Sequence, residues 1–143
     1  MQTTSKEFNL EPTGSQEEPA RVLSIGLTRE VEEGFPIAFL EYLHGRGFTS
    51  GEIYSLVIPA RTLKHRKAKR QNLSSEETER ALRLDKISHL GRKVFGSLEK
   101  AFRWLRRSNS RLDGRAPLEM LRTEVGGNLV EEMLYQIDEG IYV

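Results

Sequence analysis

Residues 98–143 read LEKAFRWLRRSNSRLDGRAPLEMLRTEVGGNLVEEMLYQIDEGIYV, and this stretch carries the clearest helical pattern in the chain. Its apolar residues recur at helical spacing in two groups, one on each side of a glycine- and proline-containing turn. The first group is Leu98, Ala101, Phe102 and Leu105, and the second is Leu129, Val130, Met133, Leu134 and Ile137. We therefore expect a short helix, a turn around Gly114, and an amphipathic helix that starts at Pro117 and stops at Gly140.

Three apolar residues, Ile141, Tyr142 and Val143, follow the expected end of this last helix. An apolar end of this kind either folds back onto its own domain or a dimer mate, or it is offered to a partner protein. The residues alone leave both alternatives open.

The preceding part of the chain also has helical patterns. Expected helices run from about Glu32 to His44, from Ser50 to Leu56, from Ala60 onward, and from residues 73–77 to about Phe95. Thr49 with Glu52, and Ser74 with Glu77, have the spacing of a capping box, which marks a helix start. We therefore predict an all-α protein, with a helix-turn-helix bundle followed by a small helical domain.

The first residues are poor in large apolar side chains. Residues 1–21 are rich in Gln, Thr, Ser, Glu, Pro and Gly, so we expect a disordered arm. Residues 22–27 are apolar enough to form a short strand or an extended docking segment. The predicted organisation is a flexible arm over 1–31, a helix-turn-helix region over 32–72, a connecting helix over 73–97 and a C-terminal domain over 98–143.

Charge is distributed unevenly along the 143 residues, although the formal net charge is only +1. Residues 57–72 contain six Lys or Arg and no acid, whereas the residues after Gly114 are mainly acidic. Such asymmetry indicates charged partners more than the total charge does. The chain has no cysteine, no apolar run of membrane-spanning length and no signal-peptide pattern, so a cytoplasmic protein without disulfides is the simplest interpretation.

The stretch 49–69 fits a helix-turn-helix: a capped short helix, an apolar turn and a basic helix. Such a unit places its second helix in the major groove, where cations also neutralise phosphates. The predicted DNA-binding residues are Arg61, Thr62, Lys64, His65, Arg66, Lys67 and Lys69. The alternative is a solvated basic helix on an ordinary bundle.

Catalysis is not indicated by any motif in the chain. The histidines, His44, His65 and His89, are far apart, and no residue group has metal-ligand spacing, a phosphate-loop pattern or a nucleophile motif. We therefore expect no enzymatic activity, no metal and no cofactor. Trp104 lies among apolar and basic residues, and we expect it in the core rather than at an interface.

Several spaced positions resemble a known family. These are Ala101-Phe102-x-Trp104-Leu105, Ser108-Asn109, Leu112-x-Gly114, Pro117-Leu118-x-x-Leu121-x-Thr123 and Gly140, with Arg61-Thr62-Leu63-x-x-Arg66 and Leu73-Ser74-x-Glu76-x-x-x-Arg80 upstream. Over about residues 34–143 the chain resembles the Xre/MbcA/ParS-type antitoxins, which are partners of RES-domain toxins. Ser108-Asn109 departs from a common Pro-Asn, and Gly126-Gly127 weakens the start of the last helix.

This resemblance implies a function. Antitoxins of this type cover the active site of a NAD-depleting RES toxin with their C-terminal region, repress their own operon through DNA binding, and commonly form homodimers. The toxin-binding residues implied here are Leu129, Glu132, Met133, Gln136, Glu139, Gly140, Ile141, Tyr142 and Val143. The alternatives are a stand-alone helix-turn-helix regulator whose C-terminal half only dimerises or senses a ligand, and an adaptor with no DNA role.

Overall fold

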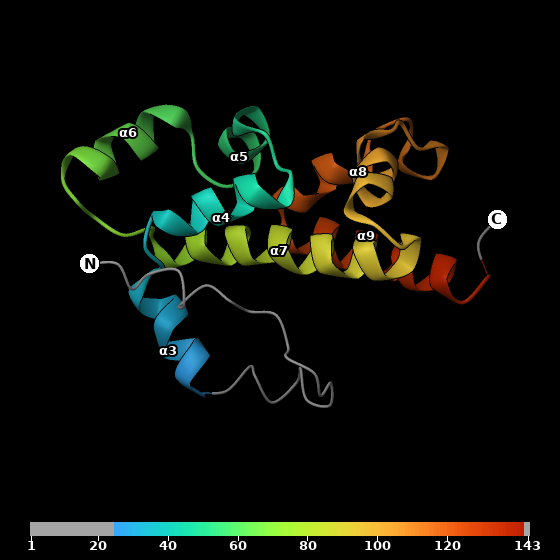
Figure 1. Ribbon diagram of the computed structural model, residues 1–143, viewed down its shortest axis with the longest axis horizontal. Coiled ribbons are helices and arrows are strands. Elements are labelled where there is room, and N and C mark those ends of the chain that lie inside the picture. Colours follow the sequence, from blue (N-terminus) through green and yellow to red (C-terminus); the bar gives the residue numbers. More distant parts are fainter. Residues whose placement is uncertain (1–24, 142–143) are drawn as a thin grey trace.

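The computed structural model describes residues 25–141, and every regular element in that range is helical (Figure 1). The all-α prediction is therefore confirmed. The elements are α3 (Ile25–Glu33), α4 (Ala38–Arg46), α5 (Ser50–Leu56), α6 (Ala60–Ala68), α7 (Ser75–Phe95), α8 (Leu98–Arg106), the 3₁₀ helices η1 (Ser110–Leu112) and η2 (Pro117–Arg122), and α9 (Glu124–Asp138).

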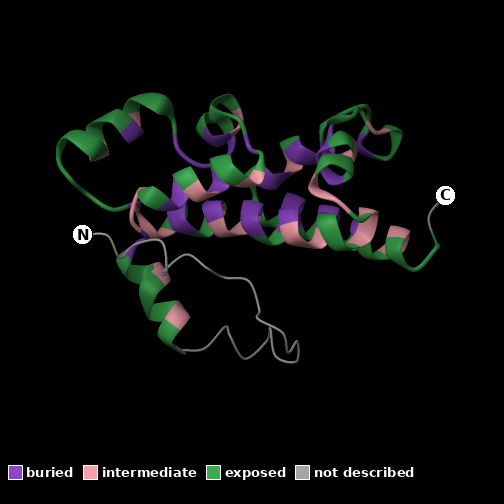
Figure 2. Cartoon of the chain, viewed as in Figure 1, coloured by how far each residue is buried: buried purple, intermediate pink, exposed green. Residues whose placement is uncertain are grey.

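Helix α7 runs along the long axis of the molecule, with α4 against its first part and α8 and α9 against its second part (Figure 1). Its 21 residues make it about 31 Å long. Its buried residues, purple in Figure 2, recur along one face. They include Ala81, Leu84 and Ile87, which belong to one apolar cluster that extends from Phe35 to Leu134. The two halves of the chain therefore share one core.

The chain breaks between α3 and α4, where the sequence predicted one helix from Glu32 to His44. Gly34 has a left-handed φ of +92°, and a Cβ on it would overlap the carbonyl oxygen of Leu73. The backbone N–H of Phe35 then donates to the Thr78 hydroxyl of α7 at 3.0 Å. This tertiary contact, together with the restriction that Pro36 places on Phe35, ends the first helix and starts a second.

Residues 25–33 form helix α3, with Leu27 and Val31 against the core. A helix therefore begins inside the segment predicted as an arm over residues 1–31, and residues 25–27 are helical rather than extended. Residues 1–24, which include most of the predicted arm, lie outside the described residues.

The C-terminal stretch also forms two elements where one helix was predicted from Pro117. The 3₁₀ helix η2 ends at Arg122, and the Thr123 hydroxyl accepts a hydrogen bond from Gly126 N at 3.0 Å to cap α9. Gly126 and Gly127 are buried in the first turn of α9, against the Met120 carbonyl and the Arg83 side chain. The two glycines allow α9 to start in this close contact.

We predict opposite effects of alanine at two helical glycines. Gly126→Ala lowers the free energy of unfolding by at least about 2 kcal/mol, because its Cβ would overlap the Met120 carbonyl oxygen. Gly45→Ala in α4 meets nothing within 4 Å and raises the same free energy by about 0.5–1 kcal/mol. Urea unfolding followed by circular dichroism measures both. Equal effects at the two positions would contradict the close approach at Gly126.

Candidate functional site

Helices α5 and α6 with the turn between them form the predicted helix-turn-helix unit. Thr49 and Glu52 make both bonds of the capping box: the Glu52 N–H donates to the Thr49 hydroxyl at 3.1 Å, and the Thr49 N–H donates to the Glu52 carboxylate at 3.0 Å. The turn residues Val57 and Ile58 are buried, and Leu63 anchors α6 in the core. The bounds predicted for α5 and the start predicted for α6 are confirmed.

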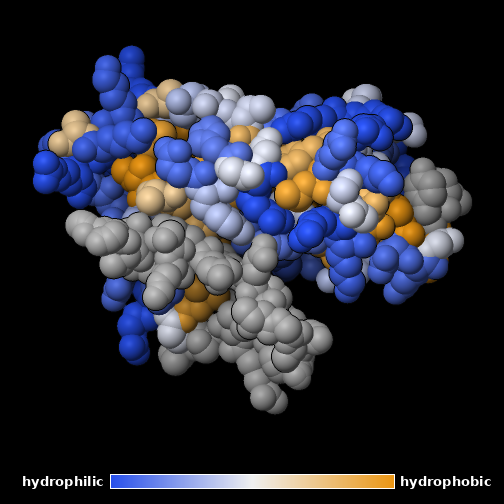
Figure 3. All heavy atoms as spheres, in the orientation of Figure 1, coloured by the Kyte–Doolittle hydropathy of each residue, from blue (hydrophilic) through white to orange (hydrophobic). Residues whose placement is uncertain are grey.

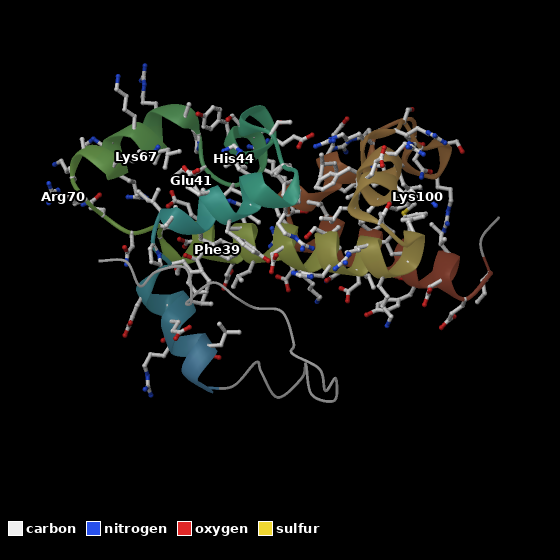
Figure 4. All side chains as sticks on the ribbon, viewed as in Figure 1. Phe39, Glu41, His44, Lys67, Arg70 and Lys100 are labelled. Carbon is white, nitrogen blue, oxygen red and sulfur yellow. The ribbon has the colours of Figure 1, made fainter. Side chains whose placement is uncertain are left out.

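Most of the predicted DNA-binding residues lie on the open side of α6. Arg61, Lys64, His65, Lys67 and Lys69 are exposed and Thr62 is half-buried. Within residues 25–141 the four cations among them have no ion pair or side-chain hydrogen bond. Figure 4 shows Lys67 on α6 and Arg70 just beyond its end, and Figure 3 shows hydrophilic side chains gathered over this end of the molecule. We name one set of residues the α6 face: Arg61, Thr62, Lys64, His65, Lys67 and Lys69.

Arg66 differs from its neighbours on α6 because its guanidinium is engaged. It donates to both carboxylate oxygens of Glu77 at 3.0 and 2.9 Å, and the Glu77 side chain is only 7% exposed. Glu77 also accepts from the Ser74 N–H at 2.7 Å and so caps α7. Burial raises the pKa of Glu77, but Arg66 and the Ser74 N–H outweigh it, and the pKa is lowered overall. Arg66 therefore joins α6 to the start of α7.

A second exposed surface lies on α9. Val125, Leu129, Glu132, Gln136 and Glu139 are four and three residues apart, so they share one side of the helix. We name this set the α9 face. Val125 is 79% exposed and Leu129 40%, whereas the second half of the face carries carboxylates. The surface is apolar at one end and acidic at the other.

The residues implied as toxin-binding divide into several environments. Leu129, Glu132, Glu139, Gly140 and Ile141 are exposed, and Gln136 is half-buried and accepts a hydrogen bond from Arg111 at 2.9 Å. Met133 is only 2% exposed, so it supports the face from inside. Tyr142 and Val143 lie outside the described residues. Sequence reasoning missed Val125 and the exposed Tyr135, although Val125 is one helical turn before Leu129.

Arg106 of α8 connects the helix-turn-helix unit to the C-terminal part. Its guanidinium donates to both oxygens of Glu52 at 2.8 and 3.0 Å and to the Gly47 carbonyl at 2.8 Å, and it lies 4.4 Å from the Phe102 ring centroid. Burial raises the pKa of Glu52, but Arg106 and the Thr49 N–H lower it more, so the carboxylate stays ionised. Phe102 itself packs edge-on against Phe48 at 4.9 Å. These contacts join α8 of the C-terminal part to α5 and to the loop that precedes it.

The structure also bears on Trp104, on metal ligands and on membrane-spanning helices. Trp104 is half-buried with its ring 5.6 Å from that of Phe95, in agreement with the predicted core position. Among residues 25–141 no three His, Cys, Asp or Glu side chains are placed to hold a metal ion. None of the helices described is both long and apolar enough to cross a membrane.

The fold defines an all-α protein with a helix-turn-helix unit and an attached C-terminal helical domain. The antitoxin Xre-like helix-turn-helix domain matches residues 26–84, and the antitoxin Xre/MbcA/ParS C-terminal toxin-binding domain matches residues 90–140. A protein named Antitoxin Xre from Pseudomonas putida is 39% identical over 110 residues, which are 77% of this chain and 69% of that protein. The chain belongs to the Xre antitoxin family.

We predict that Glu77→Gln destabilises the protein in a pH-dependent way. The lowered pKa of Glu77 means that its ion pair stabilises the fold above about the ordinary value of 4.5, and that this contribution is lost as the pH falls through the folded-state pKa. Glu77→Gln therefore lowers the free energy of unfolding by about 1–3 kcal/mol at pH 7. The difference from wild type shrinks below pH 4.5.

Urea titrations at pH 7, 5 and 3.5 measure this difference. Glu76→Gln is the matched control, because Glu76 is exposed in the same first turn of α7. A wild-type advantage over Glu77→Gln that stays constant from pH 7 to 3.5 would contradict the role given to the ion pair.

Proposed function

We propose that this antitoxin neutralises a NAD-depleting RES-domain toxin with its C-terminal region and represses its own operon through the α6 face. It acts in the cytoplasm as a homodimer, by binding rather than by catalysis. The observation that carries the proposal is the α9 face, an exposed apolar and acidic surface within the segment that matches the toxin-binding domain. The identity of the toxin rests on the family resemblance.

The α6 face supports the DNA-binding part of the proposal. Arg61, Lys64 and Lys67 are exposed and have no acidic partner among the described residues, so their charges are available to phosphates. Leu63 fixes α6 in the core and Arg66 fixes it to α7, so the helix that carries the other cations is held in place. This arrangement suits phosphate contact and base readout in a major groove.

The α9 face supports the toxin-binding part. Exposed Val125 and Leu129 have apolar area that a partner can bury, at about 25 cal/mol per Å². Glu132 and Glu139 complement a basic cleft of the kind that binds a phosphate-bearing nucleotide. Ile141 is 60% exposed and continues the chain from this helix toward the two terminal residues. The apolar patch provides affinity and the carboxylates provide orientation.

We predict that Arg61→Ala/Lys64→Ala weakens binding to duplex DNA from the region upstream of the protein's own coding sequence by about tenfold or more. The loss of two phosphate or base contacts also reduces the magnitude of the slope of log Kobs against log salt, by about two for each bound protomer. Fluorescence anisotropy titrations at several salt concentrations measure both quantities.

The control is Arg92→Ala/Lys93→Ala. It removes the same charge from exposed positions in the last turn of α7, outside the α6 face. Wild-type DNA affinity in Arg61→Ala/Lys64→Ala would favour an adaptor with no DNA role.

We predict that Val125→Ser/Leu129→Ser weakens binding to the RES toxin by about tenfold and leaves DNA binding unchanged. Deletion of residues 141–143 has the same two effects, because the apolar tail follows the same helix. Calorimetric titration with the purified toxin, and NAD levels in cells that co-express it, provide the measurements.

Tyr54→Ser is the matched control for the toxin measurement, since Tyr54 is as exposed as Leu129 but lies on α5. Full neutralisation by both variants would refute the assignment of toxin binding to this surface. Failure of the wild-type protein to bind the toxin would favour a stand-alone regulator.

A further inference from the structure

A groove separates α5 of the helix-turn-helix unit from η2 of the C-terminal domain. Its volume is about 650 Å³. Glu52, Ser55 and Leu56 line one wall, and Arg115, Leu118 and Arg122 line the other. Arg106 reaches between the walls, where it is paired with Glu52. The groove is therefore lined by both the helix-turn-helix unit, for which DNA is the proposed partner, and the C-terminal domain, for which a toxin is the proposed partner.

The groove has arginine side chains that can attract an anion, because its acidic side chains do not fully neutralise them. Glu52 is neutralised by Arg106 through two short hydrogen bonds. Glu119 lies 3.7 Å from Arg115, but both side chains are more than half exposed, so this pair is weak and an anion can compete for Arg115. Arg122 is exposed and has no ion pair or side-chain hydrogen bond within residues 25–141. The η2 wall therefore offers two guanidinium groups to a ligand.

The position of the groove indicates a macromolecular anion. Helix α6, helix α5 and the segment between α8 and η2 follow one another along the upper edge of the molecule in Figure 1. Figure 3 shows hydrophilic side chains at both ends of this edge. In Figure 1, α5 and the segment between α8 and η2 lie alongside α7, whose length of about 31 Å is less than one turn of B-DNA, and α6 extends past the start of α7. In a helix-turn-helix complex the first helix crosses the DNA backbone, which here places the backbone beside α5 and its groove.

We propose that this groove takes the sugar–phosphate backbone of the DNA that α6 binds, with Arg115 and Arg122 in contact with phosphates. The toxin-binding domain then supplies part of the DNA interface. The proposal rests on the proposed DNA-binding function of α6. The wide exposure of the arginines, 57% for the Arg115 side chain, suits a phosphate chain in solvent better than a desolvated small ligand.

The test is Arg115→Gln/Arg122→Gln in the full-length protein, titrated with the same upstream duplex and with an equally long duplex of unrelated sequence. The variant binds both duplexes about five- to tenfold more weakly, and the slope of log Kobs against log salt falls by about two for each bound protomer. Hydroxyl-radical footprinting shows that protection at the flanks of the site is lost while protection at its centre stays.

The matched control is Arg92→Gln/Arg103→Gln, two exposed arginines of α7 and α8 that do not line the groove. Circular dichroism confirms that both double variants fold. DNA affinity and footprint equal to those of the control would overturn the proposal, as would unchanged DNA titrations combined with weaker toxin binding, which would assign the groove to the toxin.

The Arg61→Ala/Lys64→Ala variant separates this proposal from the function on which it rests. If that variant weakens DNA binding but the groove variant does not, the groove proposal fails and the DNA-binding function stands. If neither variant weakens it, both fail.

Discussion

Packing on α7 is the constraint on which the rest of the structure depends. The first half of this helix receives α4 and, through the pair of Arg66 and Glu77, α6. The second half receives α8, where a Cβ on Gly91 would lie only 3.0 Å from that of Ala101. Small residues at such positions allow helices to approach closely, which increases the buried apolar area per turn. The two family matches end and begin within α7, at residues 84 and 90, so the helix belongs to both domains.

The elements that sequence predicted well are those whose ends are determined locally. The capping boxes at Thr49 and Ser74 marked the starts of α5 and α7, because their hydrogen bonds span only three residues. The break at Thr123 was missed although its cap is local, from Gly126 N to the Thr123 hydroxyl. The break at Gly34 was missed because it depends on a partner that is distant in the sequence, the Leu73 carbonyl. Local helical propensity cannot reveal a contact of this kind.

In the candidate site, too, the sequence predicted local features but not those that depend on tertiary contacts. Periodicity identified α6 and α9 as helices with two sides, but it could not show that Arg66 turns toward a carboxylate eleven residues away. It also could not decide which of the neighbouring apolar residues on α9 face inward, so buried Met133 was grouped with exposed Leu129. Burial depends on how α9 is rotated against α7, and this rotation follows from the close contacts of Gly126 and Gly127.

Glu52 has two roles, since it completes the cap of α5 and binds Arg106. A change at position 52 removes both interactions, whereas a change at position 106 leaves the cap of α5 in place. Substitutions at the two positions are therefore not equivalent: position 106 can vary without loss of the cap, whereas position 52 must keep a residue that caps a helix. Chimeras that combine halves from different family members should accordingly take residues 52 and 106 from the same parent.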